Sequence, residues 1–110
     1  AAMALAEKQA RQASLSLMTA RLQAEQAKLA VTTAASARQA AEDARRVTLE
    51  RYEAGLASLT DLLAVQAELE HARHALIQAE TSQIKARAMT HFQQGTLLEA
   101  LSLSEEEAPR

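Results

Sequence analysis

Small apolar residues recur along the first half of the chain at alternating steps of three and four positions. This is the spacing of a coiled-coil seam, and its members are Ala10, Ala13, Leu17, Ala20, Ala24, Ala27, Val31 and Ala34. Beyond Ala34 we expect the seam to drift through Ala37, Ala41, Ala44 and Val47. No Gly or Pro interrupts this stretch, so the pattern predicts one helix over residues 3–54.

A second seam repeats every seven residues. One layer is Leu62, Leu69 and Leu76, and the other is Val65, Ala72 and Ala79. These six positions are the predicted helix-packing seam of a helix over residues 59–94. Gln83 breaks the Leu series, either as a device that selects register or partner, or as a tolerated polar residue.

Gly95 is the expected end of this second seam. We predict a coiled-coil domain over residues 1–95. The leucines after Gly95 predict a short helical extension or a continuation of the second helix, and the polar end of residues 96–110 predicts a disordered acidic tail.

Between the two seams the chain reads R-Y-E-A-G-L-A-S-L-T-D-L-L-A-V-Q over residues 51–66. Gly55 can adopt the left-handed conformation that ends a helix. Ser58 can cap the next helix, and Asp61 then lies at the N3 position, where a negative charge is favourable. The predicted tip is residues 55–58, and a turn this short sends the second helix back along the first. The predicted fold class is therefore all-α: a long antiparallel helical hairpin, or coiled coil.

Alanine fills 27 of the 110 positions, and its side chain buries little apolar area. A lone hairpin of this composition is marginal. We therefore expect self-association into a helical bundle, or a longer protein of which this chain is an excised fragment.

Charge and composition argue against several classes of function. The net charge is −2 with both signs interspersed, which predicts no nucleic-acid partner. The longest apolar runs fall far short of the ~20 residues of a bilayer span, so we expect no membrane span. The first residues lack the basic region and cleavage site of a signal peptide.

Glu68 and His71, with Glu70 and His74 beside them, form the only group that resembles a metal site. The Glu-x-x-His spacing occurs in di-iron bundles, but these side chains lie off the seam. We expect them to face solvent and to make contacts along the helix, such as Glu70 with His74. No metal, no cofactor and no catalytic residue is predicted, because no nucleophile–base pair or phosphate-binding loop is present.

The spacing Tyr52-x-x-Gly55-x-x-Ser58-x-x-Asp61-Leu62-Leu63-x-x-Gln66 resembles the last periplasmic hairpin of TolC-type outer-membrane efflux proteins. In that family the tip faces the periplasmic adaptor (membrane-fusion) protein of a tripartite pump, and the helices form part of the tunnel wall. The resemblance implies the periplasmic portion of an outer-membrane protein. It also implies an adaptor-binding tip made of Arg51, Tyr52, Gly55, Leu56, Ser58 and Leu59.

The chain departs from the family pattern in two ways. It has Val65-Gln66 where the family often has Ala-Gln, and it contains neither barrel strands nor a first hairpin repeat. The alternative function is a free-standing coiled-coil interaction or scaffold module without a transport role. Apolar residues at an exposed tip favour docking, since a solvated loop is ordinarily polar.

Overall fold

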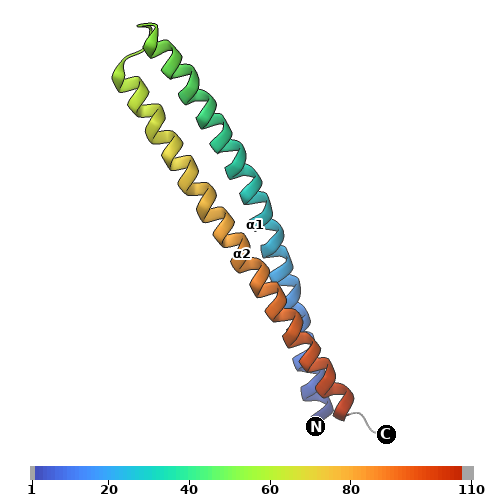
Figure 1. Ribbon diagram of the computed structural model, residues 1–110. Helices are drawn as coiled ribbons and strands as arrows, with labels where there is room; N and C mark the ends of the chain where they lie inside the picture. The colour runs from blue at the N-terminus through green and yellow to red at the C-terminus, as the bar shows by residue number, and fades with distance from the viewer. Residues whose placement is uncertain (1, 108–110) are drawn as a thin grey trace. The chain divides into compact units, whose positions relative to one another are not determined.

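The structure is a computed structural model that describes residues 2–107, and it consists of two helices (Figure 1). Helix α1 spans Ala2–Glu53 and helix α2 spans Leu59–Glu107. The helices are antiparallel and are joined by residues 54–58 at the tip. Within this described part there is no strand. The predicted all-α helical hairpin is confirmed.

The chain divides into two compact units, each built from one stretch of α1 and one stretch of α2. The tip unit is Lys28–Ser82, and the terminal unit is Ala1–Ala27 with Gln83–Arg110. Each unit has its own seam between the two helices.

In the tip unit the seam centres on Leu69, which is only 1% exposed. Ala72, three residues later, is also buried. The other predicted seam positions on α2 are half-buried, namely Leu62, Val65, Leu76 and Ala79. A repeat of seven keeps these side chains on one face, so α2 presents a continuous Leu/Ala stripe to α1.

The expected drift of the α1 seam beyond Ala34 is wrong. Ala37, Ala44 and Val47 are exposed, and of the four expected positions only Ala41 is half-buried. The repeat of seven from Val31 instead passes through half-buried Arg38 and exposed Arg45. Polar side chains therefore occupy seam positions without displacing the seam.

These two arginines are held by specific partners. The Arg38 side chain is half-buried and donates to Glu42 at 2.9 Å, while its Nε is buried without a hydrogen-bond partner. Such an unpaired donor costs free energy. Arg45 Nε donates to Gln66 Oε1 on α2, which links the two helices next to the tip.

In the terminal unit the seam is built almost wholly from alanine. The buried residues are Ala6, Ala13, Leu17 and Ala20 of α1 and Ala100 of α2. Thr90 is half-buried, and its Oγ1 donates to the carbonyl oxygens of Ala86 (3.0 Å) and Ala20 (3.3 Å). This hydroxyl therefore joins the two helices at a position that continues the series Leu62, Leu69, Leu76 and Gln83.

The predicted end of the second helix near residue 94 is wrong, and the alternative expectation, that the leucines after Gly95 continue this helix, is confirmed. Gly95 lies inside α2, and the helix continues to Glu107 because half-buried Leu97 and buried Ala100 extend the seam. Packing at these two positions outweighs the roughly 1 kcal/mol that Gly costs in a helix. Residues 104–107 of the expected disordered tail are helical, and residues 108–110 lie outside the described part.

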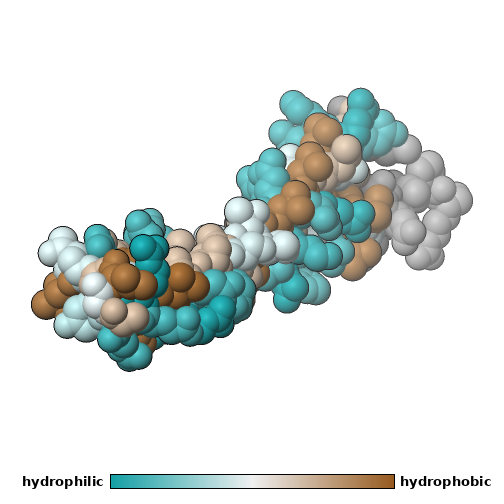
Figure 2. All heavy atoms as spheres, turned by 90° about the horizontal axis from the view of Figure 1, so that it is seen from above, coloured by the Kyte–Doolittle hydropathy of each residue, from teal (hydrophilic) through white to brown (hydrophobic). Residues whose placement is uncertain are grey.

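The core of the hairpin is thin. Among the residues described, five alanines and two leucines are buried, whereas large apolar side chains on both helices remain exposed. Figure 2 shows these apolar side chains as brown areas at the surface, interspersed with hydrophilic ones. Little apolar area is removed from water, so each buried leucine contributes a large share of the stability.

We expect Leu69→Ala to lower the free energy of unfolding by about 2–4 kcal/mol, because it opens a cavity at the most buried side chain. The exposed Ile77 in the same unit provides the control. Ile77→Ala should cost less than about 1 kcal/mol. Urea denaturation followed by circular dichroism measures the free energy of unfolding of both variants. An equal decrease in the two would contradict the proposed seam.

Candidate functional site: the hairpin tip

Helix α1 ends in a Schellman motif. Gly55 has a φ of 77° and lies at the C′ position. The Leu56 N–H donates to the carbonyl oxygen of Arg51 at 2.7 Å, and the Gly55 N–H donates to that of Tyr52 at 3.0 Å. These two bonds satisfy carbonyl groups that would otherwise be unpaired at the helix end, and they fix the direction in which the chain leaves.

Helix α2 starts three residues later in a reciprocal capping box. The Asp61 N–H donates to Ser58 Oγ at 3.1 Å, and the Ser58 N–H donates to Asp61 Oδ2 at 3.1 Å. The Leu62 N–H then donates to the carbonyl oxygen of Ser58 as the first bond of the helix. Two helix caps therefore flank only Leu56 and Ala57, which leaves the tip little conformational freedom.

The pKa of the Asp61 carboxyl lies below its usual value of 3.8. The main cause is the hydrogen bond that the carboxylate accepts from the Ser58 backbone N–H. The Ser58 side chain and the positive charge of Arg51 lower this pKa further. The cap is therefore formed by the ionised carboxylate.

The tip exposes large apolar side chains on this fixed backbone. Leu56 is 71% exposed, and Tyr52 and Leu59 are also exposed. In a Schellman motif the C″ residue often packs against C3, but here C″ is Leu56 and C3 is the charged Arg51. Leu56 is therefore left in solvent at the turn.

The six predicted tip residues occupy one short stretch around the reversal. Arg51, Tyr52, Leu56, Ser58 and Leu59 are exposed, and Gly55 supplies the turn between them. Leu63 belongs to the sequence motif of the tip but not to the six predicted adaptor-binding residues, and it is exposed as well. Its spacing of four from Leu59 places both leucines on the same side of α2 and could have added it to that set.

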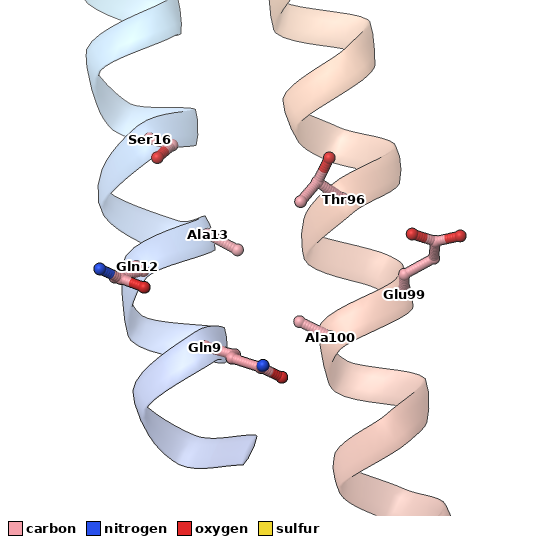
Figure 3. Close-up of a pocket in the computed structure, with 7 residues that line it drawn as sticks. All are labelled: Gln9, Gln12, Ala13, Ser16, Thr96, Glu99 and Ala100. Carbon is pink, nitrogen blue, oxygen red and sulfur yellow. The ribbon is translucent and has the colours of Figure 1, made fainter. Parts of the chain in front are cut away.

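Open grooves lie between the helices in the described part of the terminal unit. The first, of about 310 Å³, is lined by Gln9, Gln12, Ala13, Ser16, Thr96, Glu99 and Ala100. Figure 3 shows Ala13 and Ala100 pointing toward each other from the two helices. The second, of about 350 Å³, is lined by Leu15, Ser16, Thr19, Ala20, Gln23, Met89 and Gln93. Short side chains such as alanine leave these hollows, and we assign no ligand to either.

The suspected metal group on α2 is solvent-exposed. Glu70 accepts hydrogen bonds from Gln66 at 3.1 Å and from Arg73 at 2.8 Å, where we expected His74. Among the residues that the structure describes, no three His, Cys, Asp or Glu side chains are grouped as metal ligands. Within the same part, neither helix has a stretch apolar enough to cross a bilayer.

Comparison with known proteins gives no family for this chain: no protein-family model, no curated protein and no solved structure matches it. The resemblance to efflux proteins therefore depends on the tip residues themselves.

The two glycines should respond in opposite directions to the same substitution. At each of them an added Cβ meets nothing within 4 Å, but only Gly55 has a positive φ. Gly55→Ala should therefore lower the free energy of unfolding by about 1–2 kcal/mol through backbone strain. Gly95→Ala, inside α2, should raise it by roughly 0.5–1 kcal/mol. Urea denaturation of both variants tests this, and a change of the same sign in both would contradict the assigned turn.

The Asp61 cap should make stability depend on pH. Because the pKa of Asp61 is lowered in the folded chain, its stabilising contribution is complete above the usual value of 3.8 and is lost as the pH falls through the folded value. Asp61→Asn should lower the thermal midpoint at pH 7, and this difference from the parent should shrink at pH 2.5. The same difference at both pH values would show that the charge of Asp61 does not support the cap.

Proposed function

We propose that this chain is a structural and docking hairpin of an outer-membrane efflux duct, and that its tip contacts the periplasmic adaptor protein of a tripartite pump. The single observation that carries this proposal is the exposed Leu56 on a backbone held by two helix caps. The two arms act as the wall and support of the duct, and the tip is the contact surface. No chemical step is part of this function.

The caps favour docking for an energetic reason. A binding surface that is already fixed loses little conformational entropy when its partner arrives. Exposed apolar side chains then gain free energy as they leave water. Tyr52, Leu56 and Leu59 supply this apolar area, and Arg51 beside them can pair with a carboxylate at the rim of the interface.

The resemblance to the last hairpin of TolC-type efflux proteins supports the choice of partner. The matching positions are Tyr52, Gly55, Ser58, Asp61, Leu62, Leu63 and Gln66. In this proposal the chain belongs to the periplasmic portion of an outer-membrane protein, and self-association supplies the remaining wall of the duct.

A free-standing scaffold hairpin is the second candidate function. The observation that favours it is the presence of exposed apolar residues on α1 away from the tip, among them Leu15, Met18 and Leu22. Genes for an inner-membrane pump and an adaptor next to the gene of this chain would favour the efflux duct, and their absence would favour the scaffold.

Adaptor binding tests the proposal directly. We expect Leu56→Asp and Leu59→Asp each to weaken binding of an adaptor hairpin by about tenfold or more, because each places a charge in an apolar contact. Ile77→Asp is the matched control, since Ile77 is an exposed apolar residue of the same unit that lies away from the tip. Isothermal titration calorimetry with the purified hairpin measures the adaptor dissociation constant of all three variants.

A second variant tests the geometry of the tip. Gly55→Pro forces φ to about −65°, whereas Gly55 has a φ of 77°, so it should abolish binding together with the turn. If Leu56→Asp, Leu59→Asp and Gly55→Pro all bind like the parent, the tip is not the docking surface. If Ile77→Asp weakened adaptor binding as much as the tip variants do, the contact would not be confined to the tip.

A further inference from the structure

The terminal unit carries a second apolar stripe on the outer side of α1. Leu15, Met18 and Leu22 follow one another at steps of three and four, and all three are exposed. The buried residues of the same stretch are Ala13, Leu17 and Ala20. At 3.6 residues per turn the two sets lie on roughly opposite sides of the helix. Helix α1 therefore has a seam that α2 does not cover.

Charged residues continue this outer stripe in both directions. Lys8 and Arg11 precede Leu15 by seven and four positions, and Glu25 follows Leu22 by three. Lys8, Arg11 and Glu25 are all exposed. Glu7 borders the N-terminal end and pairs with Arg11, so Lys8 and Arg11 leave one net positive charge there. The outer stripe is apolar in the middle and acidic at Glu25.

We propose that the outer stripe, defined as Lys8, Arg11, Leu15, Met18, Leu22 and Glu25, is an interface for a second copy of this chain in the antiparallel direction. Leu15 of each copy then lies opposite Met18 of the other. The same alignment places Lys8 opposite Glu25 and Arg11 opposite Leu22, each pair occurring twice through the two-fold axis.

Charge complementarity selects this orientation. A parallel pair in register would place Lys8 against Lys8 and Glu25 against Glu25, and like charges across a helix pair are destabilising. In the antiparallel pair Lys8 lies opposite Glu25 at both ends, so both contacts join opposite charges. Arg11, which forms an exposed ion pair with Glu7 at 3.8 Å, can lay its aliphatic stem over Leu22 of the second copy.

An antiparallel pair is not the arrangement of a duct whose tips all face one adaptor, so this interface is an assembly separate from the duct wall of the proposed function. It uses no residue of the tip unit. A tip variant such as Leu56→Asp should leave pairing through the outer stripe unchanged. Failure of adaptor docking and failure of self-pairing are therefore separate results.

Sedimentation equilibrium of the full chain measures the pairing. We expect a reversible dimer. Lys8→Glu and Glu25→Lys should each raise the dimer dissociation constant about tenfold, because each turns two attractive contacts into repulsive ones. The double variant restores opposite charges and should bring the constant back to within about threefold of the parent. A parallel pair would show no such rescue.

Leu22→Glu tests the apolar centre, and Leu98→Glu is its matched control. Both leucines belong to the terminal unit, and they are 65% and 67% exposed. Leu22→Glu should remove the dimer while circular dichroism keeps its helical signal, and Leu98→Glu should leave the dimer intact. A monomeric parent at all concentrations, a dimer that survives Leu22→Glu, or charge reversals without effect would each overturn the proposal.

Discussion

The left-handed turn at Gly55 is the constraint on which the rest of the structure depends. Without it α1 and α2 would have no chain reversal, and neither seam could be covered within one molecule. The positive φ of Gly55 and the two bonds of the Schellman motif turn the chain, and the Ser58–Asp61 cap restarts the helix at once. Both arms then meet along seams whose layers are mostly Ala and Leu.

A seam with so much alanine has two consequences for function. It lets two helix backbones pack with short side chains between them, but it buries too little apolar area to leave a large margin of stability. The larger apolar side chains are consequently left outside, at the tip around Leu56 and on the outer stripe around Met18. Both surfaces suit contacts with other chains, and both proposals arise from this distribution.

The reversal and the α2 seam were predictable from sequence, because Gly55, Ser58 and the leucine repeat are local signals. The path of α1 beyond Ala34 was not, since an apolar pattern cannot reveal that half-buried Arg38 holds a seam position or that exposed Arg45 donates across to Gln66. The end of the second helix could not be predicted from Gly95 for a related reason. A glycine ends a helix only where packing stops, and buried Ala100 continues the packing of α2 beyond Gly95. The tip residues could be named in advance. Leu63 belongs to the same sequence motif, and its spacing of four from Leu59 already indicated the same side of α2.

Distance measurement between two spin labels tests the reversal most directly. The chain contains no cysteine, so Ala44→Cys and Ala67→Cys can be labelled selectively; both positions are exposed next to the Arg45–Gln66 hydrogen bond. With labelled chain diluted in unlabelled chain, a turn at Gly55 predicts a separation within roughly 20 Å, since packed helix axes lie about 8–10 Å apart. A separation near ~35 Å, the length of an uninterrupted helix between these positions, would contradict the account.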